Sequence, residues 1–74
     1  MDNQHEHIHG YRNLPQADID RMNAVKALAD HCGSMVEELR RTPGIDLRWV
    51  SIAQTHLQQG FMAAVRSIAR PTSF

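Results

Sequence analysis

Three histidines alternate near the N-terminus, at His5, His7 and His9. Imidazole nitrogens are good ligands for zinc or nickel, and alternate residues of an extended segment lie on one side of it. No cysteine or carboxylate elsewhere completes a ligand pattern, and the adjacent His31 and Cys32 point to different sides of a helix. Closed zinc sites normally show a clear pairing of ligands. The sequence therefore favours a solvated N-terminal arm and predicts no metal site.

The residue types that act as nucleophiles and bases are not arranged for catalysis. Cys32 lies on an apolar helical seam, which indicates a buried thiol rather than a nucleophile. Ser51, Thr55 and His56 share one predicted helix, but such spacing alone is weak support for a catalytic unit. The acids are scattered, and the chain has no glycine-rich phosphate loop. We expect neither an enzyme nor a bound cofactor.

Tyr11, Arg12 and Lys26 carry the chemistry of a nucleotide site. Tyr11 follows a glycine and is the only tyrosine. It either packs the N-terminal arm onto a helix or stacks on a nucleobase, with Arg12 beside it. Lys26 follows Val25 in the apolar half of a predicted helix. Its side chain either extends to solvent or directs a compact ammonium at a phosphate. Residue types alone leave both alternatives open.

Two long helices, predicted over residues 16–41 and 46–69, must position these residues. An N-terminal arm (1–14) precedes them, a C-terminal tail (70–74) follows, and the breaker Thr42-Pro43-Gly44 separates them. Asp18 and Asp20 lie near the positive end of the first helix dipole. The first helix has a seam in which apolar residues are spaced alternately three and four apart: Met22, Val25, Ala29, Cys32, Val36 and Leu39.

The second predicted helix begins after Asp46, a good N-cap residue. Gly33 and Gly60 lie inside helices at a cost of roughly 1 kcal/mol each, which a close backbone or ligand contact would explain. The main apolar stripe of the second helix consists of Val50, Ala53, Leu57, Phe61, Ala64 and Ile68. Two antiparallel helices cannot cover apolar faces this wide, so an isolated hairpin leaves Leu28, Met35, Trp49 or Ile52 in water. The sequence therefore predicts an all-α hairpin that forms a symmetric homo-oligomer.

Composition narrows the classes of function. The 74 residues make at most one domain, and eight basic residues balance eight acidic ones. This balance provides no long-range field for a nucleic-acid backbone, although local cations can still bind a small anion. The single cysteine suits a reducing compartment. No secretory signal or membrane-spanning run is visible, so we expect a soluble intracellular protein with no nucleic-acid or membrane partner.

The chain resembles the phage anti-CBASS cyclic-oligonucleotide sponges over nearly its whole length. CBASS is a bacterial defence in which cyclic nucleotide signals activate cell-killing effectors, and related sponges act against the NAD-derived signals of the Thoeris defence. The matching pieces are His5-Glu6-His7, Gly10-Tyr11-Arg12, Ile19, Met22-Asn23, Lys26, Asp46, Arg48-Trp49-Val50, Thr55, Gly60-Phe61-Met62, Arg66 and Pro71-Thr72. Each piece is weak alone, and the resemblance depends on their order and spacing together.

The resemblance implies helical hairpins that assemble into hexamers and sequester the signal without hydrolysing it, in the cytoplasm of the infected bacterial host. It implies a site for a cyclic dinucleotide of the 3′,3′-cyclic GMP-AMP type formed by Tyr11, Lys26 and Arg12. It further suggests a separate site for cyclic tri-AMP, at which we place Arg66 and Thr72. Two alternatives remain: a helical interaction module that binds partner helices and no small ligand, and a phosphodiesterase-like enzyme that degrades the same messengers.

Overall fold

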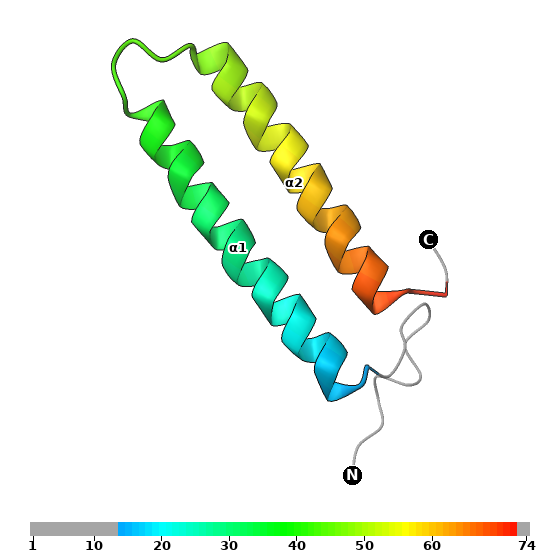
Figure 1. Cartoon of the computed structure of the whole chain (residues 1–74). Coiled ribbons are helices and arrows are strands. Elements are labelled where there is room, and N and C mark those ends of the chain that lie inside the picture. The colour runs from blue at the N-terminus through cyan, green and yellow to red at the C-terminus, as the bar shows by residue number, and fades with distance from the viewer. Residues whose placement is uncertain (1–13, 73–74) are drawn as a thin grey trace, which may run out of the picture.

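The computed structural model describes residues 14–72. It contains two α-helices, α1 (Gln16–Arg40) and α2 (Leu47–Ala69), which lie antiparallel and are joined by a short turn (Figure 1). The described segments that precede α1 and follow α2 lie at the same end of the hairpin. The predicted all-helical hairpin is therefore confirmed.

The turn at residues 41–46 follows from the residues that end α1. Arg41 caps the helix with its backbone N–H, which donates to the carbonyl oxygens of Glu37 and Glu38, so α1 ends one residue before the predicted position. The Thr42 hydroxyl donates to the Glu38 carbonyl oxygen at 2.7 Å. Gly44 then adopts φ +85°, a left-handed conformation that glycine tolerates without a Cβ clash. The breaker therefore reverses the chain as its residue types predict.

Asp46 begins α2 as an N-cap. One carboxylate oxygen accepts from the backbone N–H groups of Arg48 at 3.0 Å and Trp49 at 3.4 Å. These are two of the donors that have no partner inside the first turn of a helix. The N-cap prediction for Asp46 is confirmed.

We expect Asp46→Ala to lower the free energy of unfolding by about 1 kcal/mol, because it removes the oxygen that satisfies both donors. Asp46→Ser is the matched control, since serine also accepts from these groups and should restore most of the loss. Denaturant unfolding at one fixed protein concentration measures both variants. Equal stability of Asp46→Ala and the wild type would contradict this role.

The core between the helices is thin. Val36 and Val50, exposed by only 3% and 5%, are the buried apolar residues within positions 14–72. The other members of the predicted seam on α1 are half-buried. Several large apolar side chains remain exposed: Ile19, Leu28, Met35, Ile45, Leu47, Trp49 and Met62. The predicted exposure is confirmed for Leu28, Met35 and Trp49, whereas Ile52 is half-buried. One hairpin leaves much of its apolar surface uncovered.

Polar contacts reinforce the core near the turn. The Arg40 guanidinium donates to the Gln54 side-chain oxygen and, at 3.4 Å, to the Ser51 hydroxyl. A Cβ atom built on Gly33 or Gly60 would have no neighbour within 4 Å. The predicted close contact at these glycines is therefore absent within the hairpin itself.

Along residues 14–72, neither helix has a stretch of the length and hydropathy needed to cross a lipid bilayer.

Candidate functional site

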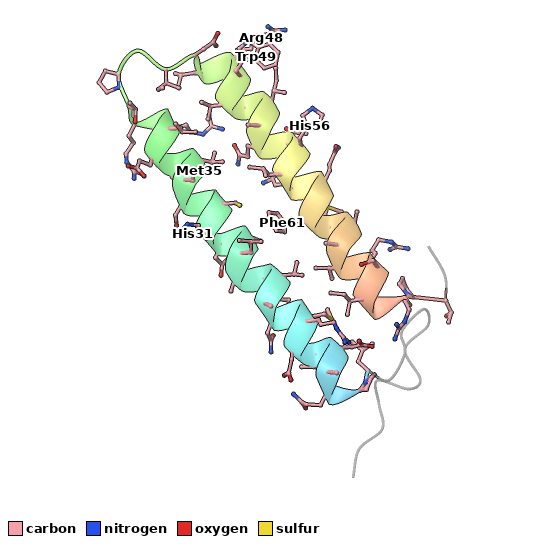
Figure 2. The ribbon with its side chains drawn as sticks, viewed as in Figure 1. His31, Met35, Arg48, Trp49, His56 and Phe61 are labelled. Atoms are coloured by element: carbon pink, nitrogen blue, oxygen red, sulfur yellow. The ribbon has the colours of Figure 1, made fainter. Side chains whose placement is uncertain are left out.

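A groove of about 1280 Å³ runs along one flank of the hairpin between the helices. Phe61 projects from α2 toward α1 in this region (Figure 2). The apolar lining comes from residues of both helices: Ala29, Cys32, Val36, Leu57, Phe61, Met62 and Val65. The groove is larger than the roughly 300–1,000 Å³ of typical small-ligand pockets. Its size and apolar lining suit another polypeptide segment better than a small ligand alone.

Charged residues of both signs lie along the groove. Asp30 and Glu37 line it from α1, Arg41 lines it near the turn, and Arg66 lines it near the end of α2. Gln54 and Gln58 add neutral polar groups from α2. This mixture gives no uniformly positive channel for a nucleic-acid backbone, in agreement with the balanced composition. A small anion would depend on individual cations.

Lys26 is exposed on α1. It lies four residues before Asp30, which lines the groove, and residues four apart share one face of a helix. The ion pair between Asp18 and Arg70 marks one point where the two helices lie at the same level. Lys26 lies eight residues after Asp18, and Met62 lies eight residues before Arg70, so the two residues lie at about the same level of the antiparallel helices. Lys26 is therefore an exposed residue about one turn before the first α1 residues that line the groove.

Arg66 and Thr72 lie near the C-terminal end of α2. Arg66 is exposed at the edge of the groove, and its backbone carbonyl oxygen accepts from the Arg70 N–H at 2.8 Å. Thr72 is exposed two residues beyond Arg70. Tyr11 and Arg12 lie outside the described residues, as do His5, His7 and His9. Of the predicted ligand residues, Lys26, Arg66 and Thr72 thus have defined positions.

A cluster that the sequence analysis missed joins the ends of the helices. Asp18 is only 6% exposed, and its two carboxylate oxygens pair with Arg21 at 2.6 Å and Arg70 at 2.7 Å. Only the favourable position of Asp18 in the helix dipole was recognised from sequence. The missed signal is its spacing, because Asp18 lies four residues before Met22 and continues the seam of α1 backward. A charged residue on such a seam must find a partner across the interface.

The residues considered for catalysis are not brought together. The Ser51 hydroxyl accepts from Arg40, toward α1, whereas His56 projects from α2 away from α1 (Figure 2). Cys32 is a half-buried free thiol in the groove lining. Within residues 14–72, histidine, cysteine and acidic side chains form no group of three that could hold a metal ion. This part of the chain contains no recognisable catalytic constellation.

The fold and its exposed groove define a small two-helix hairpin protein whose apolar surface extends beyond its own core. The chain belongs to the Acb2/Tad1 hairpin family, since the family model described as "Acb2/Tad1, hairpin domain" matches residues 3–69. It is also 39% identical to the Anti-CBASS protein 2 of Pseudomonas phage JBD67. That alignment has 105 positions and covers 96% of this chain and 97% of the relative.

Family membership confirms the predicted resemblance and places the chain among anti-defence sponge proteins rather than enzymes. The matched region includes Tyr11, Arg12, Lys26 and Arg66, and it ends before Thr72. The alignment with the phage protein is longer than the 74 residues of this chain, so the relative has residues with no counterpart here. The match establishes the family.

Proposed function

We propose that this protein is an anti-CBASS sponge that binds cyclic oligonucleotide messengers and sequesters them without degrading them. The observation that carries the proposal is the 39% identity to an Anti-CBASS protein 2 over 96% of this chain. A sponge acts by mass action, because tight binding lowers the free signal below the level that its effector needs. The mechanism therefore requires high expression in the cytoplasm of the infected bacterium and slow release of the bound messenger. It requires no catalytic turnover.

The working unit is a homo-oligomer, which we infer to be a hexamer. Leu28 and Trp49 are 57% and 60% exposed, a large fraction for apolar side chains in a monomer this small. The groove adds further apolar surface on one flank of the hairpin. Gly33 lines this groove with open space around its Cβ position, so a neighbouring subunit has room to approach there. Symmetric association would cover these surfaces.

The cyclic dinucleotide site lies across a twofold axis of this oligomer. A cyclic dinucleotide has two bases, two phosphates and a near-twofold shape. Tyr11 from each subunit stacks on one base, with Arg12 beside it, and Lys26 from each subunit pairs with one phosphate. Each stack contributes on the order of 1–3 kcal/mol. The exposure of Lys26 on α1 supports this role, since its side chain is accessible to a ligand.

The cyclic trinucleotide site lies on a threefold axis, where each subunit faces one of three phosphates. Arg66 and Thr72 supply a cation and a hydroxyl to the phosphate oxygens. Their location in the last turn of α2 and just beyond it supports a shared site, because both belong to the same end of the hairpin. A hexamer with twofold and threefold axes holds both kinds of ligand.

One experiment tests the proposed function against its alternatives. The purified oligomer is mixed with 3′,3′-cyclic GMP-AMP, free ligand is removed, the protein is denatured, and the released compound is identified by mass spectrometry. Recovery of the intact messenger supports the sponge. A linear product would indicate a phosphodiesterase and overturn it. No bound compound would favour the interaction module, the alternative consistent with the exposed Leu28, Met35 and Trp49.

Met62, which lines the groove and is 66% exposed, allows a separate test of the proposed oligomer. We expect Met62→Glu to weaken the oligomer, because a carboxylate would replace an apolar side chain at the subunit contact and would lose its hydration there, while each hairpin stays helical. Light scattering gives the mass, and circular dichroism gives the helix content. Gln59→Glu is the matched control, since it adds the same charge at an exposed position outside the groove lining. An unchanged mass for Met62→Glu would exclude this surface as the subunit contact.

A further inference from the structure

One carboxylate joins the first turn of α1 to the end of α2. Asp18 accepts from Arg21 with one oxygen and from Arg70, 52 residues away, with the other. Hydrogen bonds between charged groups are strong and directional. The carboxylate is buried, whereas the side chains of Arg21 and Arg70 are 65% and 49% exposed. The pair with Arg70 therefore joins the start of α1 to the residue that follows α2.

Arg70 also has an unusual backbone. Its φ of 46° and ψ of 58° are left-handed, and it is the residue other than glycine with positive φ within positions 14–72. Such a conformation is uncommon for a residue with a side chain and persists where surrounding contacts hold it. The Arg70 N–H donates to the Arg66 carbonyl oxygen, and its guanidinium donates to Asp18. These contacts set the direction in which Pro71 and Thr72 leave the helix.

We propose that Asp18 and Arg70 are positioning residues for the trinucleotide site, an inference that rests on the proposed function. Their ion pair holds Thr72 in a defined place relative to Arg66, so that the hydroxyl and the guanidinium reach the same phosphate. A preorganised site binds more tightly because less chain must be ordered when the ligand arrives. Arg70 therefore acts through Thr72 and Arg66 and does not itself contact the ligand.

The dinucleotide site is an internal control for this inference. Lys26 lies eight residues beyond Asp18 within α1, whose own backbone hydrogen bonds hold its position. Loss of the pair between Asp18 and Arg70 therefore displaces the tail after α2 and leaves Lys26 in place. Because Arg70 is half exposed, its loss should affect stability little. The expected result is a selective loss of trinucleotide affinity.

The test is isothermal titration of the full-length protein with cyclic tri-AMP and with 3′,3′-cyclic GMP-AMP. We expect Arg70→Gln to weaken cyclic tri-AMP binding on the order of tenfold and to leave dinucleotide binding unchanged. Arg70→Lys keeps the charge and should restore part of the affinity. Arg48→Gln is the matched control, because it removes the same charge at the turn end of α2. Mass and helix content are checked for each variant.

Asp18→Asn separates positioning from direct ligand contact. This variant leaves the Arg70 charge available but removes the carboxylate that orients it. Weaker cyclic tri-AMP binding supports positioning, whereas equal or tighter binding means that Arg70 contacts the ligand and overturns the inference. If Asp18→Asn does not fold, unchanged trinucleotide affinity of Arg70→Gln still overturns the inference. A wild type that binds neither messenger would instead refute the proposed function. One that binds only the dinucleotide would refute the trinucleotide site together with the inference.

Discussion

Lys26→Ala is expected to abolish high-affinity binding of 3′,3′-cyclic GMP-AMP. In the proposed twofold site, the substitution removes two ammonium groups, one from each phosphate. A hydrogen bond to a charged group contributes about 1.5–3 kcal/mol, so the loss of two corresponds to a decrease on the order of 100-fold or more. Lys26 is exposed, and alanine is the strongest helix former, so α1 should keep its stability. The effect should fall on the ligand alone.

Equilibrium dialysis of the oligomer measures this effect. Arg48→Ala is the matched control, since it removes a cation at the start of α2, outside the proposed dinucleotide site. Lys26 is also the only lysine, which permits an independent readout without mutation. Bound dinucleotide should protect Lys26 from acetylation by an amine-reactive reagent, as followed by mass spectrometry of its peptide. Wild-type affinity in Lys26→Ala, or equal acetylation with and without ligand, would remove Lys26 from the site. Tyr11→Ala tests the stacking partner in the same assay.

The hairpin was predictable because its determinants are local. A seam with alternating spacings of three and four residues specifies a packed helix face, and Val36 on that seam is one of the two most buried apolar residues described. Asp46 precedes the second apolar stripe and caps it with its carboxylate. Thr42, Pro43 and Gly44 interrupt both patterns where the chain turns. Each of these signals extends over a few residues and does not depend on what other subunits do.

Contacts between the two helices were harder to predict. Asp18 pairs with Arg70 across 52 positions, and nothing adjacent to either residue identifies its partner. Charged residues usually face solvent, so the type of residue at position 18 argues against burial although its spacing places it on the seam. Ile52 is half-buried although it lies off the main stripe of α2. Such features depend on the register of two helices, which the spacing within one helix does not specify.

The candidate site was predictable only through the family resemblance. Lys26 resembles an ordinary helical lysine, and its spacing does not distinguish a phosphate contact from a solvated side chain. The proposed sites also require residues from several subunits, whereas the sequence describes one. The structure of one hairpin supplies the surfaces that must meet, including the groove that contains Met62 and Arg66. Ligand measurements on the oligomer are therefore the direct test of each site.

Arg66→Ala should produce the reciprocal result, with loss of cyclic tri-AMP binding and retention of dinucleotide binding. Three copies of Arg66 meet one ligand in the proposed threefold site. Three charged contacts at about 1.5 kcal/mol or more each correspond to a decrease on the order of 1,000-fold. Arg66→Lys keeps the charge but loses the planar pair of donors, so intermediate affinity is expected. Titration with both ligands gives the two affinities.

Because Arg66 also lines the groove, its loss could act on assembly instead of on the ligand. Mass measurement separates these causes. An Arg66→Ala protein that keeps its mass and its dinucleotide affinity but loses cyclic tri-AMP has lost a ligand contact. A protein that dissociates and loses both ligands has lost a subunit contact, and Arg66 then belongs to the interface. Unchanged affinity for cyclic tri-AMP would exclude Arg66 from the trinucleotide site. It would leave the proposed role of Lys26 in the dinucleotide site unaffected.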